Sequence, residues 1–196
     1  MSENSQNAID ATIAHHPSPG EQYYPKFAVT PELDTEATRL ISLYPEGRSE
    51  SAVLPILHEI QKQFGYICGD SIIWTAQKIG STPAHVLGVV SFYPGLRQEC
   101  PGKLHIRVCR TLSCSMAGSE ELVNDLCKKL GIDRSKLTHD HPIGVSACGK
   151  WSIEFVECLA NCGGAPSLLV NDKLHQNITP DKADDLIAQY KDDKEA

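Results

Sequence analysis

Apolar residues recur at helical spacing through the first half of the chain and divide it into four short segments. The helices predicted from this spacing cover residues 31 to about 44, 50–64, 70–79 and 83–92. Thr30 and Thr82 each precede a proline, as expected at a capped helix start, and Asp70 is expected to cap the third helix. Gly65 and Gly80 stand where helices commonly end. The pattern predicts an N-terminal four-helix unit, residues 31–94.

The period changes in the second half. Leu104, Ile106 and Val108 alternate with polar residues, which predicts a strand with one buried face. Further elements are predicted in the order helix, strand, hairpin and helix, at residues 118–130, 151–157, 167–176 around Asn171-Asp172, and from Thr179-Pro180 onward. The result is a small α/β domain, residues 103–190, with a thioredoxin-like order of elements. Residues 1–29 are predicted to be a disordered tail and residues 191–196 a C-terminal tail.

Composition narrows the class of protein. The 196 residues carry a net charge of −7 and have no Lys/Arg-rich stretch, which argues against nucleic-acid binding. No apolar run approaches the roughly 20 residues that span a bilayer. The N-terminal stretch does not resemble a secretory signal, so we expect a cytoplasmic protein without direct membrane insertion. Eight cysteines are then expected to be thiols or metal ligands instead of disulfides.

Two cysteine pairs suggest a metal centre. Cys109 and Cys114 follow the first predicted strand, and Cys158 and Cys162 follow the second. Four thiolates at strand ends suit a [2Fe–2S] cluster, with two sulfurs for each iron. A glycine pair at 163–164 allows close approach of the main chain, and its N–H groups are candidate donors toward the cluster. The spacing also fits structural zinc, or core and redox thiols without metal, and these alternatives stay open at this point.

The other cysteines and histidines are expected to be structural. Cys127 lies at an apolar helix position and is predicted to be a core residue. Cys68 and Cys100 are expected to be incidental. Cys148 is nearest the second pair in sequence and is a possible substitute ligand. The histidines at positions 15, 16, 139 and 141 are expected to lie in solvated segments rather than to bind a metal.

Longer motifs resemble one family. They are Tyr44-Pro45, SAVLPILH at residues 51–58, Gly65-Tyr66-Ile67, VLGVVSFY at 86–93, GKLHIRVC at 102–109, Gly118-Ser119 and CLANCGGAP at 158–166. In this order and spacing they resemble the thioredoxin-like [2Fe–2S] ferredoxin, the E subunit, of NADH:quinone oxidoreductase, respiratory complex I. The resemblance covers about residues 31–190.

The resemblance implies a role and a ligand set. The ligands of one [2Fe–2S] cluster would be Cys109, Cys114, Cys158 and Cys162. The partner would be the flavoprotein subunit that binds FMN and NADH, neither of which this chain would bind itself. The helical unit would dock that partner, and no stand-alone catalytic site is expected. The complex would lie at the cytoplasmic face of the membrane. The same module occurs in NAD-linked hydrogenases and formate dehydrogenases.

Two positions depart from the family pattern. Cys148 precedes Gly149 where an Asp-Gly turn is common, which would put an extra thiol near the site. Ala160-Asn161 stands where glycine is often found in the second cysteine loop.

Overall fold

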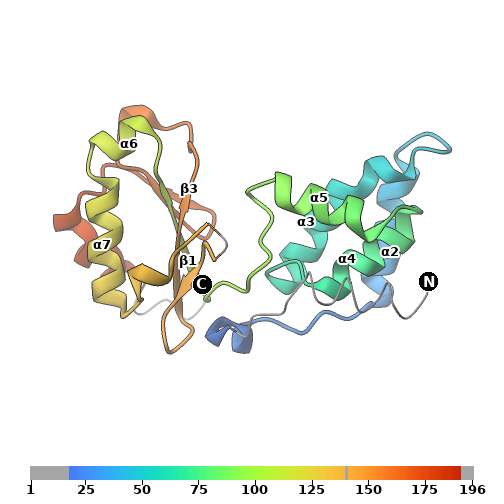
Figure 1. Ribbon diagram of the computed structural model, residues 1–196, viewed down its shortest axis with the longest axis horizontal. Helices are drawn as coiled ribbons and strands as arrows, with labels where there is room; N and C mark the ends of the chain where they lie inside the picture. The colour runs from blue at the N-terminus through green and yellow to red at the C-terminus, as the bar shows by residue number, and fades with distance from the viewer. Residues whose placement is uncertain (1–17, 140, 191–196) are drawn as a thin grey trace. The chain divides into compact units, whose positions relative to one another are not determined.

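The computed structural model describes residues 18–139 and 141–190, and these residues form two compact units. One unit comprises Tyr24–Cys100. The other comprises Ser18–Tyr23 together with the residues from Pro101 onward. In Figure 1 the first unit runs from blue to green, and most of the second runs from green to red. The polypeptide therefore passes between the units twice, once after Tyr23 and once after Cys100.

The first unit is helical, as predicted. Its helices are α2 (Pro31–Ser42), the 3₁₀ helix η2 (Ser49–Ala52), α3 (Val53–Phe64), α4 (Gly69–Ile79) and α5 (Pro83–Phe92). The Thr30 hydroxyl accepts the Leu33 N–H, and Gly65 and Gly80 adopt the left-handed conformation at helix ends. The prediction that Asp70 caps the third helix is wrong: α4 begins at Gly69, and Cys68 occupies the cap position.

The apolar stripes of these helices meet in one core. Its buried members are Leu33, Ala37, Ala52, Val53, Ile56, Leu57, Ile60, Phe64, Ile67, Ile72, Ala76, Ile79, Val86, Val90 and Leu96. Their spacing of three and four residues along each helix is the pattern from which the helices were predicted. At the end of α5, Phe92 and Tyr93 stay exposed and contact each other edge to face.

The second unit contains a mixed sheet. Its elements are β1 (Leu104–Cys109), α6 (Leu112–Met116), α7 (Ser119–Leu130), η3 (Arg134–Lys136), β2 (Gly144–Val145), β3 (Trp151–Val156), η4 (Cys162–Gly164), β4 (Leu168–Val170), β5 (Lys173–His175), η5 (Pro180–Lys182) and α8 (Ala183–Gln189). Within the described part of the chain, five strands lie in the order β2-β3-β1-β4-β5. The central pair, β1 and β3, is parallel and the other pairs are antiparallel. The short elements α6 and β2 were not predicted.

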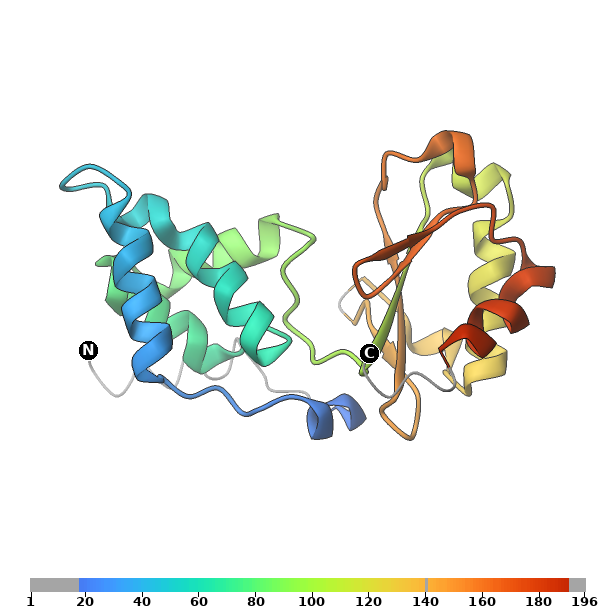
Figure 2. The same cartoon turned by 180° about the vertical axis from the view of Figure 1, so that it is seen from behind.

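Helices α7 and α8 cover one face of the sheet (Figures 1 and 2). The core beneath them contains Leu104, Ile106, Val108, Leu122, Val123, Leu126, Cys127, Ile132, Trp151, Ile153, Leu168, Val170, Ala183, Leu186, Ile187 and Tyr190. The alternation along β1 correctly predicted that Leu104, Ile106 and Val108 face this core. Cys127 is a core residue, as predicted, and its burial raises the pKa of its thiol to about 11.

The opposite side of β1 is also buried, which the alternation did not predict. His105 is 3% exposed, and its ring nitrogens lie 2.7 Å from Ser152 Oγ and 2.9 Å from Glu154 Oε1. Ser152 and Glu154 are buried as well. A buried imidazole and carboxylate are tolerated here because each finds a hydrogen-bond partner on the neighbouring strand.

The predicted disordered tail is wrong for part of its length. Pro19–Tyr23 forms the 3₁₀ helix η1 on the second unit, whereas residues 1–17 lie outside the described part of the chain. The side-chain amide of Gln22 donates to the carbonyl of Cys148 at 2.9 Å. A Cβ on Gly149 would lie 2.1 Å from the carbonyl oxygen of Pro19. Glycine is thus required for this close backbone approach, which the N-terminal composition could not reveal.

No helix in residues 18–139 and 141–190 combines the length and the apolar character needed to cross a membrane. The predicted C-terminal tail, residues 191–196, lies outside the described part of the chain.

Candidate metal centre

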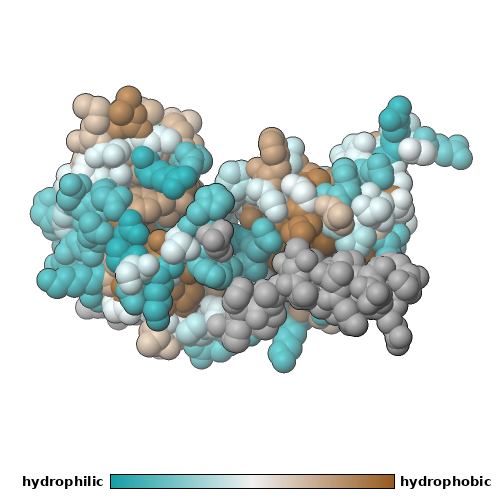
Figure 3. All heavy atoms as spheres, viewed as in Figure 1, coloured by the Kyte–Doolittle hydropathy of each residue, from teal (hydrophilic) through white to brown (hydrophobic). Residues whose placement is uncertain are grey.

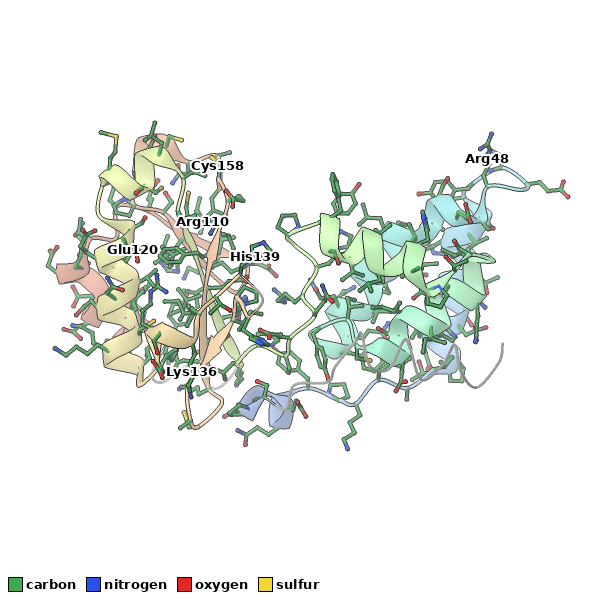
Figure 4. All side chains as sticks on the ribbon, in the orientation of Figure 1. Arg48, Arg110, Glu120, Lys136, His139 and Cys158 are labelled. Atoms are coloured by element: carbon green, nitrogen blue, oxygen red, sulfur yellow. The ribbon has the colours of Figure 1, made fainter. Side chains whose placement is uncertain are left out.

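The parallel pairing of β1 and β3 brings the two cysteine loops to one edge of the sheet. Cys109 stands opposite Val156, and the Arg110 N–H donates to the Val156 carbonyl at 3.0 Å. Parallel strands end at the same edge, so the loop that begins at Cys158 emerges beside the one that follows Cys109. Arg110 also pairs with Glu157 at 2.6 Å, which joins the two loop starts on the surface. Figure 4 shows Cys158 and Arg110 at this end of the sheet.

The first cysteine pair is buried and its members contact each other. Cys109 and Cys114 are each 2% exposed, and each thiol shifts the pKa of the other. Burial raises the pKa of Cys109, but hydrogen bonds from the Thr111 hydroxyl and from the N–H of Leu159 outweigh it, so the pKa lies below its usual value. The Thr111 oxygen lies 3.2 Å from the sulfur. The sulfur of Cys109 is thus held by groups that stabilise negative charge on it.

The pKa of Cys114 is shifted in the opposite direction from that of Cys109. Burial raises the pKa of its thiol above the usual value, and the neighbouring Cys109 and Cys162 raise it further. A backbone hydrogen bond from Ser167 opposes these effects. The interaction with Cys162 indicates that a member of the second pair lies near the first pair.

The second cysteine pair is exposed. The Ala160 N–H donates to the sulfur of Cys158 at 3.3 Å, and Ala160 adopts φ of 56°, a left-handed conformation that favours glycine. Cys162 begins η4 and is exposed. The Gly164 N–H, one of the two predicted donors toward the cluster, donates to the carbonyl of Asn161 at 3.0 Å within the loop.

The donor set fits a two-iron cluster. Two pairs of thiols follow the ends of the parallel strands β1 and β3, and the Ala160 N–H donates to the sulfur of Cys158. Hydrogen bonding also lowers the pKa of Cys109. Iron–sulfur clusters take thiolate ligands and are tuned by hydrogen bonds to sulfur. Within residues 18–139 and 141–190, no three Cys, His, Asp or Glu side chains gather closely enough to hold a single metal ion.

Cys148 does not lie near these thiols, contrary to the sequence-based expectation. It precedes β3, whereas Cys158 follows it, and a six-residue strand spans about 20 Å. Cys148 is exposed, and hydrogen bonds from the Ser146 hydroxyl and from the backbone of Lys150 lower the pKa of its thiol. This thiol cannot act as a substitute ligand in the described conformation.

The remaining residues considered from the sequence lie elsewhere. Cys68 and Cys100 belong to the helical unit. His139 and His141 are exposed on the loop before β2, and Figure 4 shows His139 beside the sheet, away from Cys158.

Sequence reasoning missed several groups that contact the thiols. Thr111 could have been found, because side chains two residues apart in extended backbone point to the same side, and Cys109 ends a predicted strand. The contacts from Leu159 to Cys109 and from Ser167 to Cys114 join residues about fifty positions apart, and no local pattern indicates them.

Comparison with known proteins gives a consistent family. The profile of the thioredoxin-like [2Fe-2S] ferredoxin family matches residues 37–191. NADH-quinone oxidoreductase subunit 2 of Thermus thermophilus is 41% identical over 129 residues, which are 66% of either chain. The E 1 subunit of the NADH-quinone oxidoreductase of Rhizobium meliloti is 32% identical over 84% of this chain and 57% of its own length. The NADP-reducing hydrogenase subunit HndA of Solidesulfovibrio fructosivorans is 31% identical over 87% of this chain and 95% of its own.

A solved structure agrees at the level of the fold. An NAD+-reducing [NiFe]-hydrogenase in the air-oxidised state superposes with a TM-score of 0.56 at 20% identity, over 74% of this chain and 24% of that one. The match to the first two curated relatives spans 57% to 66% of their lengths. The family profile covers most of the chain, including both thiol pairs. The chain belongs to the thioredoxin-like [2Fe-2S] ferredoxin family.

Proposed function

We propose that Cys109, Cys114, Cys158 and Cys162 hold one [2Fe–2S] cluster and that the chain is an electron-transfer subunit of an NADH:quinone oxidoreductase. The observation that carries this proposal is the meeting of two thiol pairs at the shared end of the parallel strands β1 and β3, in a chain of this ferredoxin family. A bound cluster of this kind accepts and donates one electron at a time.

The chain's own contribution is ligation, burial and tuning. Cys109 and Cys114 stand on a central strand and a short helix inside the fold, which fixes their positions. The Thr111 hydroxyl and the Leu159 N–H donate toward Cys109, and such donors stabilise charge on sulfur. Cys158 and Cys162 lie on the exposed side of the site, where a redox partner can approach.

We infer that the partner is a flavoprotein subunit that binds FMN and NADH. Exposed apolar side chains support docking at the thiol end of the sheet. Leu112 and Met116 are 75% and 81% exposed on α6, on either side of the buried Cys114. Figure 3 shows a brown, apolar area over this end of the unit. Large apolar side chains exposed together are typical of protein contact sites. On the helical unit, exposed Phe92 and Tyr93 support the proposal that this unit also contacts the partner.

A second candidate is the equivalent subunit of an NAD(P)-linked hydrogenase. The similarity to HndA favours it, because that alignment covers 95% of the HndA chain. Both roles use the same electron-transfer chemistry. In the first role, the complex that contains this chain would lie peripherally at the cytoplasmic face of the membrane. Copurification of the native complex, followed by assays of quinone reduction and hydrogen oxidation, separates the two roles.

Single cysteine substitutions test the ligand set. Cys158→Ser and Cys162→Ser should each lose the cluster or hold it weakly, because hydroxyl oxygen is a poor replacement for thiolate on iron. Cys127→Ser and Cys68→Ser serve as controls and should keep the cluster, since Cys127 lies in the core and Cys68 in the helical unit. Iron and acid-labile sulfide are measured in each anaerobically purified variant. Full cluster content in both ligand variants would refute the assignment.

A zinc-stabilised binding module is the competing class of function. It predicts colourless protein with about one zinc per chain and no acid-labile sulfide. A thiol-based regulator predicts a reversible Cys158–Cys162 disulfide without metal. Metal analysis and the absorption spectrum of the same preparation distinguish all three.

A further inference from the structure

Ser167 contacts the first cysteine pair through its backbone. It directly precedes β4 and is 1% exposed. The Cys109 N–H donates to the Ser167 carbonyl at 3.1 Å. Because this hydrogen bond uses main-chain atoms, it does not depend on the identity of the side chain at position 167.

The hydroxyl of Ser167 contacts the second cysteine loop. It lies 2.9 Å from the Gly164 carbonyl and 3.2 Å from the Asn161 carbonyl, to which it can donate. It also accepts a hydrogen bond from the Asn161 side-chain amide at 3.0 Å. Asn161 directly precedes Cys162, so the hydroxyl anchors the backbone beside a proposed ligand.

Few other side-chain hydrogen bonds are described for the second loop. Cys158, Ala160 and Cys162 are exposed, and Ala160 holds an unfavourable left-handed conformation. The Asn161 amide has one more partner, Gln176 Oε1, at the long distance of 3.5 Å. A buried hydroxyl with three polar contacts is therefore the strongest side-chain anchor described for this loop.

We propose that Ser167 is a positioning residue that sets the distance between the two thiol pairs, holding the first pair by its backbone and the second by its hydroxyl. This inference rests on the proposed ligand set and adds a residue that is not itself a ligand. Its consequence is directional: removal of the hydroxyl should release the Cys158–Cys162 side and leave the Cys109–Cys114 side in place.

The test uses Ser167→Ala and Asn161→Ala in the full-length chain, alone and combined. Ser71→Ala is the matched control, because Ser71 is also fully buried with its hydroxyl bonded to a carbonyl, that of Cys68 at 2.7 Å, but lies in the helical unit. Each variant is loaded with iron and sulfide, and the rate of iron release to a strong chelator is followed by the loss of visible absorption.

We expect iron release about tenfold faster from Ser167→Ala than from the unsubstituted protein, the size expected for one lost buried hydrogen-bonding group. Asn161→Ala should give a similar or smaller increase. The rate of iron release from the double variant should stay within about twofold of the rate from the faster single variant, because the two substitutions remove the same contact. The EPR spectrum of the reduced cluster should shift in Ser167→Ala and not in Ser71→Ala, since only the former lies beside the thiols.

A second measurement does not require the cluster. The Gly164 N–H donates to the carbonyl of Asn161 at 3.0 Å, and the Asn177 N–H donates to the Gly164 carbonyl at 2.7 Å. The exchange of these amides can be followed in protein prepared without metal. Hydrogen exchange at these two amides should accelerate in Ser167→Ala, whereas the Arg110 amide, bonded to Val156 beside the first pair, should keep its protection.

These measurements separate the two proposals. Unsubstituted protein that binds zinc or no metal would refute the proposed function, while amide exchange would still decide whether Ser167 anchors the loop. Iron release from Ser167→Ala as slow as from Ser71→Ala, whatever its spectrum, would overturn the positioning role. Unchanged exchange at Gly164 and Asn177 would overturn it as well. If Ser167→Ala does not fold, Asn161→Ala tests the same contact from its other side, because Asn161 is only half-buried and its substitution disturbs the core less.

Discussion

Ala160→Gly should stabilise the second unit, because Ala160 is held at φ of 56° in the second cysteine loop. The left-handed conformation costs a residue with a Cβ about 1–2 kcal/mol, and glycine escapes this cost. Glycine also gives the unfolded chain more freedom, which opposes the gain by about 0.4–1 kcal/mol. The exposed Ala160 side chain contributes little burial. The free energy of unfolding should therefore rise by about 0.5–1 kcal/mol.

The chain's two tryptophans allow this change to be assigned to one unit. Trp74 lies in α4 of the helical unit and Trp151 in β3 of the second unit. In a Trp74→Phe background, the fluorescence of the buried Trp151 follows unfolding of the second unit in urea. The expected gain corresponds to a midpoint increase of about 0.5 M for a denaturant dependence of about 1–2 kcal/mol per M.

Ala188→Gly provides the control, because Ala188 is exposed in α8 at ordinary helical geometry. That change should lower stability by about 1 kcal/mol, since glycine relieves no strain there. The reasoning is refuted if Ala160→Gly destabilises the unit as Ala188→Gly does. The variant should also load a full cluster, because the backbone N–H at position 160 that donates to Cys158 is retained.

Three further predictions follow from the second unit. In metal-free native protein at neutral pH, iodoacetamide should modify Cys148 well before Cys127. Cys148 is exposed and its pKa is lowered, whereas Cys127 is buried and its pKa is about 11. Peptide mass spectrometry at successive times determines the order of modification. Gly149→Ala should make residues 18–23 accessible to proteolysis. The φ of Gly149 is 70°, and an added Cβ would collide with this segment. Unchanged cleavage would contradict the docking of this segment on the second unit. Burial lowers the pKa of His175 below its usual 6.5. As the pH falls through 6.5, the unfolded chain therefore takes up a proton before the folded chain does, and the free energy of unfolding decreases. His175→Gln should flatten this pH dependence in urea titrations, and the same dependence in both proteins would refute the prediction.

The sequence predicts what is encoded locally. Helix starts at Thr30 and Thr82 and helix ends at Gly65 and Gly80 depend on the residues beside them, and all four positions agree with the structure. The two thiol pairs were found because each pair lies within five residues at the end of an apolar run.

Contacts between distant residues were not predictable in this way. His105 was assigned to a solvent-facing side of β1, yet it is buried because Ser152 and Glu154 on β3 satisfy its ring. Cys148 is close to Cys158 in sequence but distant in space, because the extended strand β3 separates them. Ser167 had no recognisable motif, since its hydrogen bonds join two separate segments, at Cys109 and at the loop with Asn161 and Gly164.

The proposed function depends most directly on the identity of the bound metal group. Anaerobically purified full-length protein should contain about two irons and two acid-labile sulfides per chain and show visible absorption. An EPR signal should appear only after reduction with dithionite. One zinc per chain, with no sulfide and no visible absorption, would contradict the proposal and leave a structural module in its place.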